Sequence, residues 1–163
     1  MNQYEPYRAS RALEAFIADA APLHYAIEDA PNSYEELMEH YDSLVTGDPI
    51  PVGSGGCEHS IYSRPEINQA WRAYHDGIHM VHELDFSLED EEQVCEIQIE
   101  HMRLCSKDYG TFTSEDYAAV RADIIGQAMY YARYKKYVND QARFVASCLD
   151  RGIVATLDAG DIW

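Results

Sequence analysis

Three histidines at helical spacing give the stretch 71–91 residue types that suit metal chemistry. On a helix that turns by about 100° per residue, His75, His79 and His82 fall within about 60° of one another. Neutral imidazole is a common transition-metal ligand, and a spacing of four residues lets two imidazoles reach one ion. We therefore expect His75 and His79 to bind a metal together. The alternative is that they are hydrogen-bonded core residues beside the apolar stripe of the same helix.

Two carboxylates further along the chain are candidates to complete this site. Glu91 lies near the centre of the apolar stripe of the next expected helix, where a buried, unpaired carboxylate costs several kcal/mol. Asp123 lies on a later helix, on a face of small and aromatic residues. For Asp123 the alternative is an ion pair with Arg72 or Arg121. The candidate metal ligands are His75, His79, Glu91 and Asp123.

Three further side chains are candidates for catalytic roles beside the metal. Gln127 and Tyr130 share the face of Asp123, and Asp76 follows the first candidate ligand directly. A set of histidines and carboxylates leaves coordination positions open for oxygen or substrate. The expected cofactor is therefore a divalent transition metal, iron or manganese, and the expected substrate is a small molecule.

The elements that position these residues are predicted to be five to six helices in an all-α bundle. Apolar spacing and capping residues predict helices over about 10–21, 33–47, 63–83, 87–107, 113–137 and 140–149. The expected N-caps are Ser33, Ser63, Ser87 and, for the long helix, Thr113 or Ser114. The tail 153–163 has no clear pattern.

The segment 47–63 is predicted to be an irregular loop rich in glycine and proline. Its length is unusual for a connection inside a compact domain, so we expect it to cover the mouth of a pocket. No Lys-Ser or Lys-Thr pair follows Gly56, which excludes a phosphate-binding P-loop.

Composition restricts the class of protein. The 163 residues fit one domain, and their apolar content of 47% argues against disorder. We see neither an apolar run of about 18 residues nor a signal-peptide pattern, and expect a soluble cytoplasmic protein without membrane contact. The net charge of −17 argues against direct nucleic-acid binding. The four cysteines form no CxxC pair and are expected to be free thiols.

Parts of the pattern resemble two metal-dependent classes. Carboxylates and histidines that project inward from a bundle resemble ferritin-like di-iron proteins, although the usual Glu-x-x-His pair is missing here. The order His40, His75-Asp76 and Asp123 resembles HD-domain phosphohydrolases. That resemblance implies a metal bound by these four residues and a bound water that attacks a phosphoester or nucleotide.

A third resemblance is to uncharacterised phage and bacterial helical proteins. It is carried by NQAWRAYHDGIHMVHELDFSLEDE and RADIIGQAMYY, and its matching positions are His75, Asp76, His79, Phe86, Glu91, Asp123 and Gln127. The resemblance implies a helical fold in a phage or bacterial setting and no particular activity.

The leading hypothesis is a metal-dependent helical-bundle enzyme, an iron or manganese oxidoreductase, with the phosphohydrolase as the alternative. A non-enzymatic alternative uses the acidic surface: a phage-type protein that binds and inhibits a host protein, for instance in a basic nucleic-acid groove. The partners considered are thus a small-molecule substrate, a host protein and a second copy of the chain.

Overall fold

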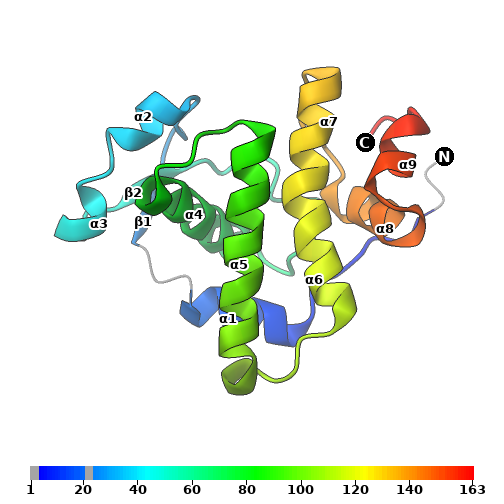
Figure 1. The fold of residues 1–163 in the computed structure, drawn as a ribbon, viewed down its shortest axis with the longest axis horizontal. Helices are drawn as coiled ribbons and strands as arrows, with labels where there is room; N and C mark the ends of the chain where they lie inside the picture. Colours follow the sequence, from blue (N-terminus) through cyan, green and yellow to red (C-terminus); the bar gives the residue numbers. More distant parts are fainter. Residues whose placement is uncertain (1–3, 21–23) are drawn as a thin grey trace.

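The computed structural model describes residues 4–20 and 24–163 and confirms the all-α class (Figure 1). The helices are α1 (Arg11–Ala20), α2 (Tyr34–Met38), α3 (Ser43–Thr46), α4 (Pro65–His82), α5 (Leu88–Tyr109), α6 (Ser114–Arg121), η1 (Ala122–Gly126, π-helical), α7 (Gln127–Tyr134), α8 (Gln141–Arg151) and α9 (Ile153–Asp158). Two short strands, β1 (Tyr25–Ile27) and β2 (Ile50–Val52), pair in parallel. Over the described ranges, no helix combines the length and apolar character that a membrane crossing requires.

Three of the four predicted N-caps are found at the start of a helix. Ser33, Ser87 and Thr113 accept hydrogen bonds from backbone N–H groups of the first helical turn, and Thr113 forms a complete capping box with Asp116. Ser63 is an exception. Arg64 occupies the N-cap of α4, and Ser63 instead donates from its backbone N–H and its hydroxyl to Glu14 of α1. The predicted cap therefore ties the start of α4 to α1.

The predicted helix over 33–47 is two short helices, α2 and α3, separated by a turn. Leu37 of α2 is fully buried against Met80 of α4 and Ile50 of β2, whereas Tyr41 is 40% exposed. Helices this short gain little from local hydrogen bonding, so the burial of a few side chains decides where the chain turns. Gly47 ends the segment in the left-handed conformation, at the predicted place.

Part of the predicted loop is also regular, because Ile50–Val52 forms strand β2. All three residues are buried and pair with Tyr25–Ile27. Pro51 lacks a backbone N–H, which a strand with a single partner tolerates. The prolines that argued against a helix here therefore do not exclude a strand. The chain from Gly53 to Arg64 contains no helix or strand.

The centre of the fold is formed by α4, α5 and the continuous helix α6–η1–α7. In Figure 1, α5 and α6–α7 stand side by side, and α1 packs against α5. The main core lies between these helices and includes Trp71 of α4, Val94 of α5 and Ile125 of η1. The continuous helix α6–η1–α7 ends at Tyr134, because Lys135 adopts a left-handed conformation. Tyr137, where the sequence predicts the end of this helix, therefore lies beyond it and is mostly exposed.

The C-terminal segment, which the sequence does not place, closes one end of this core. It forms α9, and Trp163 is buried with its ring centroid 6.0 Å from that of Phe144 in α8. The four cysteines are free, as predicted.

Replacing Gly126 by alanine is expected to destabilise the protein, although alanine normally strengthens a helix. A β-carbon at position 126 would lie 2.9 Å from the Phe144 ring, which is fully buried and cannot move away freely. Strain of about 1–3 kcal/mol outweighs the gain of about 1 kcal/mol in helix propensity. Chemical denaturation measures the change. In a Phe144→Leu background the cost of Gly126→Ala should shrink, and an unchanged cost would contradict the packing argument.

Candidate metal centre

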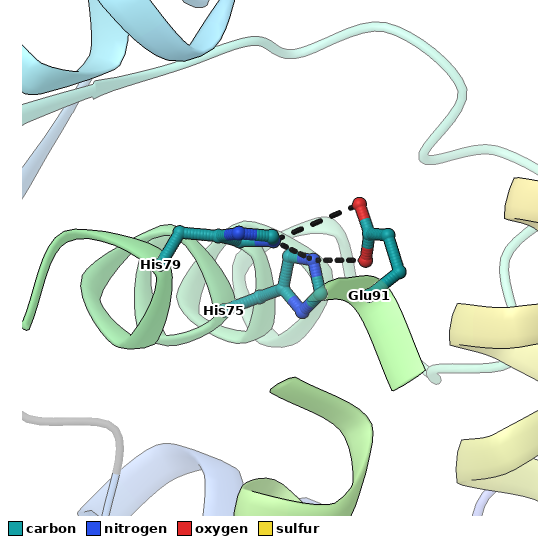
Figure 2. Close-up of side chains that lie close together, drawn as sticks. All are labelled: His75, His79 and Glu91. Atoms are coloured by element: carbon teal, nitrogen blue, oxygen red, sulfur yellow. Dashed lines mark hydrogen bonds and ion pairs between the residues drawn. The ribbon is translucent and has the colours of Figure 1, made fainter. Parts of the chain in front are cut away.

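The turn between α4 and α5 brings the two predicted histidines and Glu91 together. α4 ends at His82, the left-handed conformation of the following Glu83 reverses the chain, and Ser87 caps the start of α5. Glu91 lies in the first turns of α5, opposite the last turns of α4 that carry His75 and His79. Figure 2 shows the three side chains pointing toward one another from the two helices.

The distances between the three side chains are those of a compact ligand set. Nε2 of His75 lies 3.2 Å from Glu91 Oε2, and Nε2 of His79 lies 3.6 Å from Glu91 Oε1. The two Nε2 atoms are 3.1 Å apart. One potential ligand atom from each of the three residues can be chosen so that these atoms all lie within 4.8 Å of one another. One ion placed between them could contact all three residues.

The other ring nitrogen of each histidine is held by an oxygen acceptor. Nδ1 of His79 lies 2.9 Å from the carbonyl oxygen of Leu84, and Nδ1 of His75 lies 2.8 Å from Gln98 Oε1. A carbonyl oxygen can only accept, so each Nδ1 carries a proton and each neutral ring has its lone pair on Nε2. The two lone pairs then face each other and a carboxylate, an arrangement that is unfavourable without a cation between them.

The site is buried on one side and reaches solvent on the other. The His79 side chain is fully buried, and the Phe86 ring meets it edge to face at a centroid distance of 5.1 Å. The side chains of His75 and Glu91 remain 19% and 15% exposed. A ligand can therefore enter from the side of His75 and Glu91, while Phe86 shields His79.

A proton serves as the central cation when no metal is present. Burial alone would lower the pKa of His75, but the hydrogen bond and charge of Glu91 outweigh it and raise this pKa to about 9. Burial alone would raise the pKa of Glu91, but the two imidazoles lower it to about 2. At neutral pH the site is then an imidazolium–carboxylate pair, and a metal ion binding there would have to displace the proton.

Asp123 is not among the ligand atoms that the structure brings together in the described part of the chain. It is buried in η1, where it accepts hydrogen bonds from Gln127 Nε2 at 2.7 Å and from the Tyr62 hydroxyl at 3.4 Å. Burial raises its pKa to about 6, and these hydrogen bonds and the charges of Arg72 and His75 oppose the shift. A buried carboxyl with this pKa exchanges a proton close to neutral pH.

The predicted alternative for Asp123, an ion pair with an arginine, does not form among the described residues. Arg121 pairs with Glu96, and Arg72 donates to the carbonyl oxygen of Gly53. Arg72 acts on Asp123 only through its charge.

Of the other predicted residues, Asp76 lies beside the candidate ligands, whereas Tyr130 and His82 do not belong to the group. Asp76 is partly buried beside the ligands, and burial raises its pKa against the opposing charges of His75 and His79. Tyr130 packs against Tyr134 and Phe144 near α8. His82 is exposed at the end of α4.

The ligand set of the HD-type hypothesis is not gathered in the described ranges. His40 lies in the turn between α2 and α3. The group that could hold a metal contains His75 but not His40, Asp76 or Asp123.

Three groups that hold or cover the histidines have no predicted role in the site: Gln98, the backbone carbonyl of Leu84, and Phe86. Gln98 lies on the apolar stripe of α5, and a polar residue in such a position is the same signal that identifies Glu91. The carbonyl of Leu84 carries no side-chain signal.

Part of the segment 47–63 lines a pocket that does not include the candidate metal ligands. A cavity of about 500 Å³ lies between this loop, the N-terminal segment and α1, and is lined by Arg8, Ala9, Glu14, Cys57, Glu58, Tyr62, Ser63, Arg64 and Pro65. Tyr62 connects its wall to Asp123 through the hydrogen bond described above.

Comparison with known proteins found no matching family model, no matching curated protein and no matching solved structure.

Proposed function

We propose that this protein is a metal-dependent enzyme, an oxidoreductase whose single iron or manganese ion is bound by His75, His79 and Glu91. The observation that carries the proposal is the orientation of the two imidazoles. Both present Nε2 to one carboxylate, and both have Nδ1 tied to an oxygen acceptor. Histidine ligands of metals characteristically donate the other ring N–H to such a partner.

Three protein ligands leave coordination positions open. Two histidines and one carboxylate form the ligand set of non-haem iron centres that react with oxygen. A metal bound here would supply redox and Lewis-acid chemistry at the open positions. The exposed edge of the site, beside His75 and Glu91, is where oxygen and a small substrate would enter.

The surrounding residues of the chain would hold and move protons. Asp123, with its pKa near 6, can act as a general acid or base on a substrate beside His75. Gln127 and Tyr62 fix the orientation of its carboxyl group. The many acidic residues, with a net charge of −17, raise the local concentration of cations around the molecule.

The test is elemental analysis of the protein purified without chelators, together with its near-ultraviolet absorption under anaerobic conditions and after exposure to oxygen. We expect one iron or manganese ion per chain and an absorption that changes with oxygen. Stoichiometric zinc and no response to oxygen would contradict the oxidoreductase and favour hydrolysis, because two histidines and a glutamate also form a catalytic zinc site. Failure to bind any divalent transition metal would overturn the metal centre itself.

A further inference from the structure

Gln98 is a buried polar side chain directly behind the proposed metal centre. It follows Glu91 by seven residues on α5, and its side chain is fully buried. Its Oε1 lies 2.8 Å from His75 Nδ1, on the side of the ring that faces away from Glu91. Its Nε2, in contrast, has no hydrogen-bond partner among the described residues.

An unpartnered buried amide nitrogen reduces stability, since its donors lose their hydrogen bonds to water on folding. A leucine or methionine would fill the same position on the apolar stripe without this cost. The presence of glutamine is therefore not explained by packing. Within the described part of the chain, the one hydrogen bond of its side chain is the contact with His75.

We infer that Gln98 is a positioning residue that keeps the proton of His75 on Nδ1 and so directs the lone pair of Nε2 toward the metal. The inference rests on the proposed metal centre. Without an acceptor at Nδ1, the His75 ring would be free to rotate or to place its proton on Nε2, and either change would remove a ligand.

The two histidines differ in how they are held, which makes the inference testable. Nδ1 of His79 is tied to a backbone carbonyl, that of Leu84, which no side-chain substitution removes. His75 depends on a side chain, and its ring is also the more exposed of the two. The competence of the site therefore depends on position 98.

A neutral amide also limits the negative charge around the ligands. Glu91 lies on the same helix, and the carboxyl groups of Asp76 and Asp123 are close enough to His75 for their charges to interact. A carboxylate at position 98 would bind the Nδ1 proton more strongly but would add a buried negative charge to the metal-free protein.

The experiment compares Gln98→Leu and Gln98→Glu with Gln141→Leu, which changes a buried glutamine on α8, outside the metal-ligand group. Affinity for Zn²⁺ and Mn²⁺ is measured by competition with a chelator, and stability of the metal-free protein by chemical denaturation. We expect Gln98→Leu to weaken metal binding by about 10- to 100-fold. Gln98→Glu should retain or increase the affinity while lowering metal-free stability, and Gln141→Leu should leave the affinity unchanged.

Nuclear magnetic resonance of the Zn²⁺-loaded protein provides a second measurement that a purely structural role would not affect. We expect His75 to be bound through Nε2 and protonated on Nδ1 in the wild type and in Gln98→Glu. The inference would be overturned if Gln98→Leu bound metal with wild-type affinity. It would also be overturned if His75 of the wild type coordinated Zn²⁺ through Nδ1.

The failure of the inference can be distinguished from failure of the proposed function. If the wild type binds no metal, the proposed function fails, and Gln98 is tested in the metal-free protein. There the Nδ1 proton of His75 should be protected from solvent exchange in the wild type and lose this protection in Gln98→Leu. Equal protection in both proteins would reject a positioning role.

Discussion

Replacing His79 by glutamine is expected to lower the affinity for divalent transition metals by at least about a hundredfold. Loss of a residue that only supports a ligand costs about 10- to 100-fold, and loss of the ligand itself should cost more. Because His79 is fully buried, glutamine is preferred to alanine, since it leaves a smaller cavity. Chelator competition and elemental analysis of the purified variant measure the effect.

His40→Ala provides the control for this prediction, because it removes a histidine that lies outside the ligand group. We expect it to retain wild-type metal affinity. The opposite pattern, with metal lost in His40→Ala and retained in His79→Gln, would reject the proposed centre in favour of the HD-type arrangement. Equal metal affinity in the wild type, His79→Gln and His40→Ala would show that the metal binds at neither of the two arrangements.

Replacing Glu91 by alanine is expected to lower the unfolding free energy of the metal-free protein by about 3 kcal/mol near pH 6. The reason is that removing one partner of a largely buried ion pair leaves the other charge uncompensated. Glu91 is only 15% exposed and pairs with the partly buried His75. The same variant should also lose the metal. Glu92→Ala, at an exposed position on the same helix, should change either quantity little.

The pH dependence of stability should identify the pair. The pKa of His75 is raised from 6.5 to about 9, so its contribution is complete below 6.5 and is lost as the pH rises through about 9. The pKa of Glu91 is lowered from 4.5 to about 2, so its contribution is complete above 4.5 and is lost as the pH falls through about 2. The pair therefore stabilises the metal-free protein most between pH 4.5 and 6.5.

Denaturation of the wild type and of Glu91→Ala from pH 4.5 to about pH 9 measures the contribution directly. The difference in unfolding free energy should be largest between the two unshifted pKa values and should decrease toward pH 9. A difference that does not vary with pH would show that Glu91 stabilises the fold by packing and not through its charge.

The sequence alone was sufficient to select His75, His79 and Glu91 as candidates, because the reasons for choosing them are local. His75 and His79 lie on one helix, and their relative position follows from the helical period alone. Glu91 was identified because a carboxylate on an apolar stripe needs a partner, and the structure places it beside both histidines. The caps at Ser33, Ser87 and Thr113 could also be predicted from local sequence, because a cap involves only residues within one helical turn.

The tertiary structure decided whatever depends on how separate segments meet. Asp123 has the residue type of a ligand, but η1 places it with Tyr62 and Gln127, and the spacing within its own helix carries no information about Tyr62. The pairing of β2 with β1 and the break between α2 and α3 likewise depend on packing between distant residues.

The proposed metal centre depends on both kinds of information. Residue types and the helical period select the two histidines and the glutamate, because these properties are local. The hydrogen bonds from His75 to Gln98 and from His79 to the carbonyl of Leu84 exist only once α5 packs against α4. These contacts favour a proton on Nδ1 of each ring, and in the proposed centre they would direct both Nε2 lone pairs toward the metal.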